Sequence, residues 1–364
     1  MRILILANFD IGLYKFRKEL IGALLAKQHE VFISLPDGEM VRPLEKMGCT
    51  FLSTPVDRRG INPKTDLRLL RRYRAMLREV KPDLVLTYTI KPNIYGGIAA
   101  RMAGIPYAAN ITGLGTAFET RGILRTLVVR LYSFALKKAR VVFFENADNC
   151  DTFLSYGICR REKAHVLHGA GVNLTDYNVS PFAEHDAVRF LFIGRVMREK
   201  GIDELFGAMR RLVQEDNLSC FLDVVGPFED DYQQQLNAYA EEGWLQYHGY
   251  QADVRPFIQN CDCFVLPSYH EGMANTNLEC AASGRPIITS DIPGCREAVL
   301  NGESGLLCEI RDEDSLYDAM RRMIKMTPLA RAEMGLRGRE HMQNEFDKEK
   351  VVQETLAALF SERQ

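Results

Sequence analysis

Short apolar runs alternate with longer stretches of helical periodicity in the first half of the chain. Apolar residues recur every three or four positions in segments 15–27, 66–80 and 94–103, which predicts helices there. The runs between them are short and continuously apolar, as expected of strands buried on both faces of a parallel sheet. The predicted strands are Arg2–Leu6, Val31–Leu35, Leu84–Tyr88, Tyr107–Asn110 and Val141–Glu145, with a short addition at Val166–Leu167.

The same alternation begins again after residue 187. Two of its strands end in glycines, Gly194 and Gly226, where the chain turns towards the next helix. The elements expected here are strands at 188–193, 221–225, 263–266 and 286–290 and a helix over 202–215. The predicted fold class is therefore α/β, with two doubly wound Rossmann-like domains.

The boundary between these domains is expected in the segment Asn173–Asp186, which contains Asp, Asn, Pro and Ser and favours a linker. The predicted domains are residues 1–175 and 176–348. A last helix lies beyond the strands of the second domain, and we expect residues 349–364 to pack back on the first domain. Ligands of such sheets bind outside the carboxyl ends of the strands, so we expect an active site in a cleft between the domains.

The composition is that of an ordinary globular protein, with 46% hydrophobic and 26% charged residues. The nine cysteines include no pair at C-x-x-C spacing, which disfavours a disulfide framework or a zinc ribbon and favours the cytosol. Asp10 interrupts the first apolar run, so we interpret this run as a strand and not as a signal peptide. No run reaches the ~18 apolar residues that a membrane span needs.

The net charge of -2 conceals an uneven distribution. Residues 1–175 contain 27 Lys and Arg against 15 Asp and Glu, whereas residues 176–364 contain 19 against 33. A basic first half suits an anionic membrane surface or a phosphorylated acceptor. The acidic second half disfavours nucleic acid as a partner.

A first motif, from Gly194 to Gly201, places two cations at the end of a strand. Gly194 lets the backbone turn sharply, Arg195 then lies at the carboxyl edge of the sheet, and Lys200 precedes the next helix. Two cations and a helix N-terminus at one place suit a diphosphate. A solvated pair of surface cations is the alternative.

A second motif carries two carboxylates, Glu271 in the loop after a strand and Glu279 about one turn inside a helix that begins near Asn275. Both can accept hydrogen bonds from sugar hydroxyls. The backbone N–H groups before and within the first turn are expected to cradle an anion: Gly272, Met273, Ala274, Asn275 and Thr276. A helix N-terminus stabilised by acidic residues is the alternative.

The runs G-R-x-x-x-x-K-G, P-S-x-x-E-G-x7-E and S-D-I-P-G-x-x-E together resemble the retaining glycosyltransferases of family 4, which have the GT-B fold of two domains facing across a cleft. The resemblance covers nearly the whole chain. It implies that Arg195 and Lys200 neutralise the diphosphate of a nucleotide sugar. It also implies that Glu271 contacts the transferred sugar and that Glu279 contacts the ribose. Further contacts to the sugar nucleotide are implied for Gly12, Gly194, Gly226, Tyr250, Val254 and the cradle residues.

The resemblance also implies a mechanism with retention, in which the acceptor attacks from the face that the phosphate leaves and the phosphate takes the proton. No carboxylate nucleophile is therefore assigned, and Glu271 and Glu279 are not interpreted as the paired carboxylates of a retaining hydrolase. Preorganised cations stabilise the charge that develops on the leaving oxygen. We expect a UDP-sugar as substrate, no cofactor and no obligatory metal.

Candidate acceptor residues follow strands of the first half. Segment Asn8–Arg17 is predicted to be a loop over both substrates, made flexible by Gly12, with Arg17 towards the acceptor. Lys91 and Asn93 open a helix after another strand, where they can meet an anionic acceptor. The remaining candidates are Thr112, Gly113 and His168, of which the last can equally be a structural histidine beside a glycine turn.

Segments 58–81 and 121–140 combine basic and apolar residues, as surface helices that bind anionic lipid do; a solvated charged face is the alternative. In the first segment, the residues expected on an apolar stripe are Leu67, Leu70, Met76, Leu77 and Val80. The chain further resembles bacterial enzymes that extend sugars on a polyprenyl-diphosphate carrier, above all N-acetylgalactosaminyltransferases acting on undecaprenyl-diphosphate sugars. The resemblance implies a polyprenyl-diphosphate-linked acceptor and a peripheral position on the inner face of the cell membrane.

Other functions share some of these features. A nucleotide-sugar epimerase or a phosphorylase of similar fold would use the same diphosphate site. A dinucleotide dehydrogenase is disfavoured because no G-x-G-x-x-G follows a strand. A module that binds anionic lipid without catalysis is the alternative of another class. The acidic run Asp312–Asp314 suggests a metal, but we interpret it as a helix cap.

Overall fold

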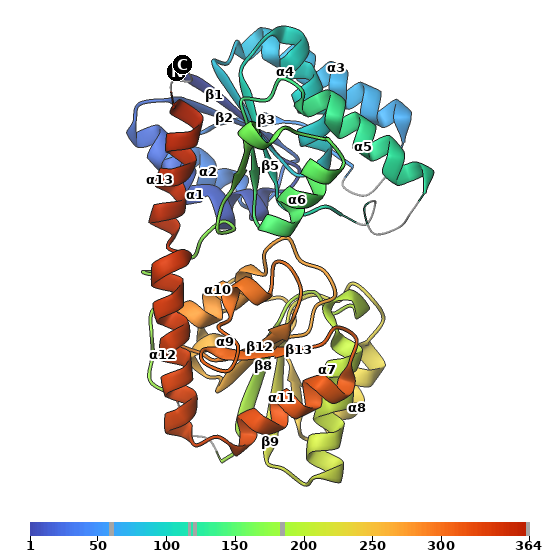
Figure 1. Ribbon diagram of the computed structural model, residues 1–364, viewed down its shortest axis with the longest axis vertical. Helices are drawn as coiled ribbons and strands as arrows, with labels where there is room; N and C mark the ends of the chain where they lie inside the picture. The colour runs from blue at the N-terminus through green and yellow to red at the C-terminus, as the bar shows by residue number, and fades with distance from the viewer. Residues whose placement is uncertain (58–61, 116–117, 119–121, 183–185, 362–364) are drawn as a thin grey trace. The chain divides into compact units, whose positions relative to one another are not determined.

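The computed structural model describes residues 1–57, 62–115, 118, 122–182 and 186–361 (Figure 1). The first residues of both basic segments therefore lie outside the described part of the chain. The chain forms two compact units, Met1–Ala170 with Glu349–Gln364, and Gly171–Lys348. It enters the second unit directly after Ala170, because the Val172 N–H donates to the Phe346 carbonyl (2.7 Å) and the Val172 carbonyl accepts from the Lys348 N–H (3.1 Å).

The first unit is built on a seven-stranded parallel sheet of order β3-β2-β1-β4-β5-β6-β7. Its central strand β1 pairs with β2 and β4, so that Ile3 lies opposite Val31 and Leu84. The strands are β1 (Arg2–Leu6), β2 (Glu30–Leu35), β3 (Thr50–Ser53), β4 (Leu84–Tyr88), β5 (Tyr107–Ile111), β6 (Val141–Phe144) and β7 (Ala164–Val166). Only β3 was not predicted, because this edge strand is partly exposed and begins and ends in polar residues.

Helices cover both faces of this sheet (Figure 1). One core contains Ile3 of β1 with apolar side chains of α1, α2 and α13, including Leu356. The core on the other face contains Leu4 of β1 with side chains of α3, α4 and α5, including Tyr132. The helices are α1 (Asp10–Ala26), α2 (Val41–Met47), α3 (Pro63–Val80), the π-helix η1 (Pro92–Gly96), α4 (Gly97–Ala103), α5 (Ile123–Leu136), α6 (Ala147–Ser155), the 3-10 turn η3 (Arg161–Lys163) and α13 (Lys348–Phe360).

The second unit repeats the design with a six-stranded parallel sheet of order β10-β9-β8-β11-β12-β13. The α/β prediction is confirmed in both units. The strands are β8 (Val188–Ile193), β9 (Cys220–Val225), β10 (Leu245–Tyr247), β11 (Cys263–Leu266), β12 (Ile287–Ser290) and β13 (Gly305–Cys308). The helices are α7 (Ile202–Arg210), α8 (Gln233–Glu241), α9 (Arg255–Gln259), α10 (Asn275–Ala282), α11 (Glu313–Lys325) and α12 (Pro328–Glu345), with short turns η4 (Arg198–Lys200), η5 (Arg211–Glu215) and η6 (Arg296–Ala298).

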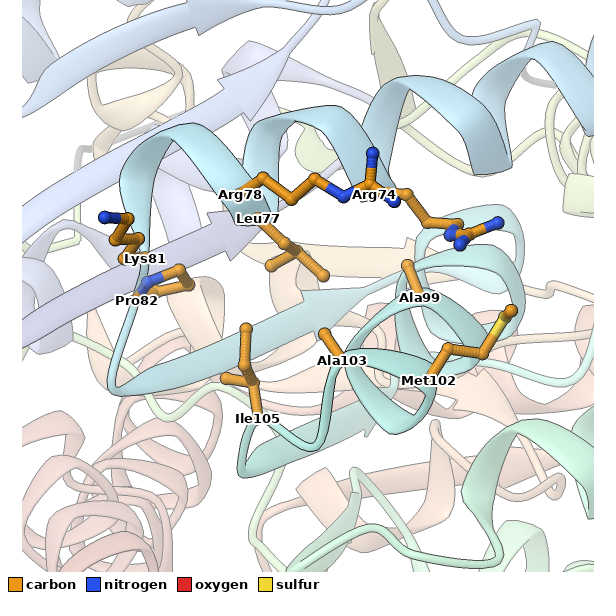
Figure 2. Close-up of a pocket in the computed structure, with 9 residues that line it drawn as sticks. All are labelled: Arg74, Leu77, Arg78, Lys81, Pro82, Ala99, Met102, Ala103 and Ile105. Atoms are coloured by element: carbon orange, nitrogen blue, oxygen red, sulfur yellow. The ribbon is translucent and has the colours of Figure 1, made fainter.

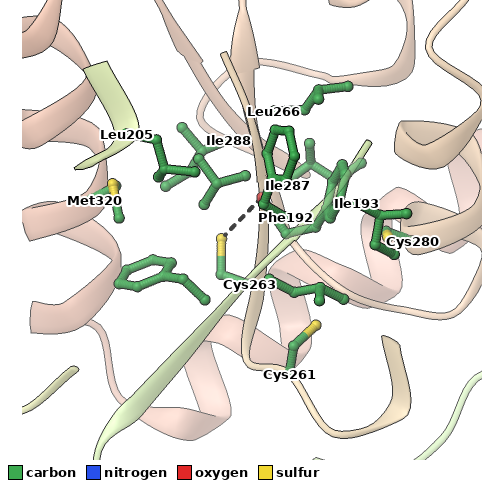
Figure 3. Packing of buried hydrophobic residues seen from close by; sticks show 14 of the residues in the cluster. Phe192, Ile193, Leu205, Cys261, Cys263, Leu266, Cys280, Ile287, Ile288 and Met320 are labelled. Carbon is green, nitrogen blue, oxygen red and sulfur yellow. Dashed lines mark hydrogen bonds between the residues drawn. The ribbon is translucent and has the colours of Figure 1, made fainter. Parts of the chain in front are cut away.

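The core of the second unit is closely packed and contains several cysteines. Figure 3 shows Ile288 of β12 beside Leu205 of α7 and Met320 of α11, with Cys280 of α10 on the other side of the strands. Burial raises the pKa of the Cys263 thiol well above its ordinary range, and that of Cys280 likewise. A buried thiol with a raised pKa is a poor nucleophile, so these cysteines serve packing.

Candidate donor and acceptor sites

The loop over residues 194–201 joins the carboxyl end of β8 to α7. It is tied to the end of β9, because the Val196 N–H donates to the Pro227 carbonyl at 2.9 Å. The Arg195 side chain remains 45% exposed, and its guanidinium bonds to Glu229 at 3.2 Å. The structure thus places an accessible cation at this edge of the sheet.

Gly201 brings this loop against the loop that follows β11. Gly201 has φ +70°, and a Cβ there would lie 2.0 Å from the Pro267 carbonyl oxygen, so no other residue fits. Alongside, the Tyr269 N–H donates to the Glu199 carbonyl at 2.9 Å. Two motifs that are far apart in the sequence therefore touch through their backbones.

This contact places Lys200 beside Glu271. The Lys200 ammonium donates to Glu271 Oε1, which also accepts a hydrogen bond from the Ser268 hydroxyl at 2.8 Å. The two charged side chains are only 16% and 13% exposed. The sequence predicted separate ligand contacts for Lys200 and Glu271, whereas the structure joins them directly. Ser268 is a contact that the sequence did not predict.

The expected anion cradle is only partly available. The helix α10 begins at Asn275 as predicted, and the N–H groups of its first turn, including Thr276, lack acceptors within the helix. The Ala274 N–H, however, donates to the Gly294 carbonyl at 2.7 Å, so the prediction of a ligand contact from this group is wrong. Gly272 and Met273 precede it, and the Met273 side chain is buried.

Glu279 lies one turn inside α10 and has an aromatic partner. The Tyr177 hydroxyl hydrogen-bonds to its carboxylate, and burial together with this carboxylate raises the pKa of Tyr177 above its ordinary range. Tyr177 lies in the segment interpreted as a linker, where its N–H donates to the Asn173 carbonyl at 3.1 Å. An isolated aromatic residue in a polar segment was the only sequence signal for this contact.

Gly226 ends β9 beside the first motif. It has φ +143°, and a Cβ there would lie 1.8 Å from the Gly194 carbonyl oxygen, so the ends of β8 and β9 pack backbone to backbone. The Gly226 N–H donates to the Gly249 carbonyl at 2.8 Å, which fixes the start of the segment that carries Tyr250 and Val254, two of the residues expected to contact the sugar nucleotide. Within that segment Tyr250 is exposed, whereas Val254 packs partly on the core and precedes α9.

In the first unit, the prediction of a loop over Asn8–Arg17 is wrong. The helix α1 begins at Asp10, whose carboxylate accepts a hydrogen bond from the Met40 N–H at 2.9 Å. Gly12 lies in the first turn of α1 and has no left-handed backbone conformation. The predicted flexibility of Gly12 is therefore wrong, because this residue lies in a helix, whereas its contact with the sugar nucleotide stays a prediction.

Arg17 projects from α1 and forms an ion pair with Glu145 at 2.6 Å, with the two side chains 11% and 10% exposed. Its guanidinium also lies over the Tyr88 ring, 5.1 Å from the centroid. Tyr88 ends β4 and Glu145 follows β6, so this pair lies at the carboxyl edge of the sheet. The exposed His168 lies at the same edge, because the next N–H, of Gly169, donates to the Glu145 carbonyl at 3.2 Å.

Lys91 and Asn93 have different surroundings. Lys91 pairs with Asp66 of α3 at 2.8 Å, with both side chains 12% exposed. Asn93 is fully buried, accepts a hydrogen bond from the Thr87 hydroxyl (2.6 Å) and donates to the Asn110 carbonyl (2.8 Å). The predicted contact of Asn93 with an acceptor is wrong, because this side chain ties β4 to β5.

Thr112 and Gly113 follow β5 at the same carboxyl edge and are partly exposed. Gly113 has φ +151° there. With Arg17, Lys91 and His168, they give this edge a set of polar and basic groups outside the ends of β4 to β7. The sequence had predicted most of this set, but not Glu145.

The structure also shows what the acidic run Asp312–Asp314 does. Asp312 accepts a hydrogen bond from the Ser315 N–H at 2.9 Å and caps α11, as predicted. Among the described residues, no three His, Cys, Asp or Glu side chains are placed to hold a metal ion. None of the described helices is long and apolar enough to cross a bilayer.

Two families match consecutive parts of this chain. The family described as Glycosyl transferase 4-like domain matches residues 12–170, and the family described as Glycosyl transferases group 1 matches residues 187–326. The solved structure of HepE from Anabaena in complex with UDP and glucose has a TM-score of 0.82 and 19% identity, covering 99% of this chain and 100% of that one. WaaG, a glycosyltransferase involved in lipopolysaccharide biosynthesis, has a TM-score of 0.75 and 15% identity, covering 99% and 100%.

Two curated relatives are similar over most of their length. The N,N'-diacetylbacillosaminyl-diphospho-undecaprenol alpha-1,3-N-acetylgalactosaminyltransferase of Campylobacter jejuni is 29% identical over 337 residues, which cover 87% of this chain and 88% of the relative. The UDP-Gal:alpha-D-GlcNAc-diphosphoundecaprenol alpha-1,3-galactosyltransferase of Escherichia coli is 29% identical over 292 residues, covering 73% and 72%. From the two family matches, the relatives and the shared fold, we conclude that the chain belongs to the glycosyltransferases of the GT-B fold.

Proposed function

We propose that this protein is a retaining glycosyltransferase of family 4 that moves a hexose or N-acetylhexosamine from a UDP-sugar to a sugar carried on a polyprenyl diphosphate. The names of the Campylobacter and Escherichia relatives support a diphosphate-linked acceptor. The capsular polysaccharide biosynthesis glycosyltransferase CapM of Staphylococcus aureus is 23% identical over 84% of this chain. We therefore assign the reaction to capsule, exopolysaccharide, O-antigen or glycan precursor synthesis.

The observation that carries this proposal is the direct contact of Lys200 with Glu271 beside the accessible Arg195. A diphosphate binds to cations. The sugar ring attached to it lies a few ångströms further on and binds to groups that accept hydrogen bonds from its hydroxyls. The packed loops after β8 and β11 supply both at one sheet edge. Glu279, held by the Tyr177 hydroxyl, supplies the further acceptor that we assign to the ribose.

The chemistry follows from these charges. Breaking the bond between the anomeric carbon and the phosphate oxygen leaves negative charge on the diphosphate. Arg195 and Lys200 stabilise that charge more than they stabilise the bound substrate, which lowers the barrier. We propose attack from the face that the phosphate leaves, with the phosphate oxygen taking the acceptor proton. Neither a carboxylate nucleophile nor a metal takes part in this scheme.

For the acceptor, we propose the carboxyl edge of the first unit. Arg17 and Lys91 are the cations there, and their ion pairs with Glu145 and Asp66 hold them in fixed positions. The exposed His168 lies beside Glu145. A diphosphate carrying a sugar would find two oriented cations and a polar rim at this edge.

We also propose that the protein is peripheral on the inner face of the cell membrane. The support comes from α5, where Ile123, Leu127 and Phe134 are 89%, 47% and 51% exposed, next to several basic residues. Exposed apolar residues among cations suit an anionic bilayer surface. On α3 the prediction of an apolar stripe that faces lipid is wrong for Met76, Leu77 and Val80, which are buried in the core, whereas Leu67 is 47% exposed.

The test is an assay with purified enzyme, a panel of UDP- and GDP-sugars, and polyprenyl-diphosphate-linked sugar acceptors. We expect one UDP-sugar to be transferred and UDP to be released in equal amount. Interconversion of UDP-sugars without transfer would favour an epimerase, and phosphate-dependent sugar 1-phosphate formation would favour a phosphorylase. No transfer and no nucleotide release with any substrate would contradict the proposal.

A further inference from the structure

The first unit contains a groove that lies away from the proposed acceptor region. It has a volume of about 420 Å³ and lies between α3 and α4 (Figure 2). It opens where α3 ends before β4 and α4 ends before β5, which is the amino edge of the sheet. Arg17 and His168 belong to the carboxyl edge, so the groove is a separate feature.

Three cations line this groove, Arg74, Arg78 and Lys81, and no acidic side chain does. Within the described part of the chain, none of the three side chains forms a hydrogen bond or an ion pair. Lys91, at the carboxyl edge of the same sheet, is by contrast paired with Asp66. Uncompensated cations around one hollow create a positive potential that favours an anion.

The other side of the groove is apolar. Figure 2 shows Arg74 and Arg78 lying along α3 and Leu77 pointing down from it, with Met102 and Ile105 opposite. Met102 is 57% exposed and forms an apolar wall of the groove together with Leu77 and Ile105. A free hydrophilic anion would gain nothing from this apolar wall, whereas an anionic amphiphile would bury part of it.

Basic and exposed apolar side chains also lie together on the neighbouring helices α4 and α5. Arg101 of α4 donates to the Phe134 carbonyl of α5 at 2.6 Å, and its guanidinium lies 4.2 Å from the centroid of the Phe134 ring. Phe134 is half exposed. The cationic and apolar surface therefore extends from the groove across α4 to α5, the helix already proposed to face the membrane.

We propose that this groove binds the phosphate headgroup of an anionic membrane lipid. The phosphate would be held by Arg74 and Arg78, and the glycerol and first methylene groups would pack on Met102 and Ile105. The inference rests on the proposed membrane association, to which it adds a defined anchor at the amino edge of the sheet. It does not depend on which sugar is transferred.

The experiment is co-sedimentation of the full chain with vesicles of phosphatidylglycerol and phosphatidylcholine. The test variant is Arg74→Gln with Arg78→Gln. Its matched control is Arg42→Gln with Lys46→Gln, which removes the same charge from α2 on the other face of the sheet. We expect the test variant to bind on the order of tenfold more weakly than the control, since each basic residue at an anionic surface contributes measurably to binding.

A second variant guards against misfolding. Lys81 has φ +49°, a left-handed conformation that glycine adopts without strain. We expect Lys81→Gly to keep the melting temperature of the wild type, or to raise it, and to weaken vesicle binding a few-fold. Transfer to a water-soluble acceptor analogue is expected to be the same in all variants.

The outcomes distinguish lipid binding in the groove from the proposed membrane association of the whole protein. Failure of the wild type to sediment would overturn both the membrane association and the groove. Equal binding of the test variant and its control would overturn the groove alone. A lowered melting temperature with unchanged vesicle binding would assign the cations to stabilising the ends of α3 and α4. Thermal protection by inorganic phosphate without vesicle binding would replace the lipid with a free anion.

Discussion

In the second unit, the candidate site is positioned by backbone contacts between loops, whereas in the first unit it is positioned by pairs of side chains. Gly201 and Gly226 let neighbouring loops approach so closely that no Cβ would fit. Arg17 and Lys91 instead depend on carboxylates from other elements. A backbone framework tolerates few substitutions at its glycines, while a paired cation depends on its partner.

The largest effect is expected from Gly201→Ala. The new Cβ would be 2.0 Å from the Pro267 carbonyl, so the loop that carries Lys200 must move. We expect most activity to be lost, together with stability of on the order of 3 kcal/mol, more than the ~1–2 kcal/mol of a left-handed alanine alone. The measurements are turnover and chemical denaturation.

The matched control is Gly243→Ala, where φ is +85° and nothing lies within 4 Å of the new Cβ. It should lower the free energy of unfolding only by the ~1–2 kcal/mol of a left-handed alanine and leave turnover near that of the wild type. Equal effects of the two substitutions would contradict the proposed packing of the two loops.

Lys200→Ala is expected to lower kcat by on the order of 10²–10³-fold, as loss of one preorganised group that stabilises a leaving oxyanion does. The fold should survive, which far-ultraviolet circular dichroism would show. The control is Arg198→Ala in the same turn, because the Arg198 side chain is 76% exposed. Near-normal turnover of Lys200→Ala would refute the role of Lys200 at the leaving group.

Arg17→Ala is expected to destabilise the protein by on the order of 3 kcal/mol, because it leaves the Glu145 carboxylate buried without its cation. It should also raise the KM for the acceptor more than the KM for the sugar nucleotide. The control is Arg160→Ala, which removes an exposed pair and should change stability by less than ~1 kcal/mol. A stability change as small as that of the control would show that the Arg17 pair does not hold this edge together.

The smallest effect is expected from Tyr177→Phe. It removes one hydrogen bond to Glu279, and one such bond is worth about 1 kcal/mol. The KM for the sugar nucleotide should rise by up to ~10-fold with kcat nearly unchanged, because this contact is the same before and during the chemical step. A fall in kcat with an unchanged KM would mean that Tyr177 acts in the reaction itself.

The same difference explains what the sequence could predict. Lys200 and Glu271 follow strands in compact motifs, and the end of a strand fixes the sheet edge at which a residue lies. Arg17 and Glu145 are separated by 128 positions, and no local pattern joins them. Asn93 lies in η1, shortly after β4, where a polar residue can face a ligand. It is buried instead and bonds to Thr87 of β4 and Asn110 of β5, which no local sequence pattern shows.

The strand and helix pattern predicted both sheets apart from the edge strands β3, β10 and β13, each only three or four residues long. The start of α1 was misplaced because Gly12 weakens a helical pattern, while Asp10 and the elements packed on α1 stabilise the helix. Tyr177 was missed for a related reason. A polar segment predicts a connection, and only the folded chain shows that one of its aromatic residues reaches Glu279.

The configuration of the product is the most direct test of the proposed transfer with retention. The wild type would be incubated with the UDP-sugar that the panel selects and a polyprenyl-diphosphate-linked sugar, in the presence of EDTA, and the new linkage examined by NMR. We predict transfer without added metal and the same anomeric configuration in the product as in the UDP-sugar. An inverted linkage, or transfer only after a metal is restored, would contradict this prediction.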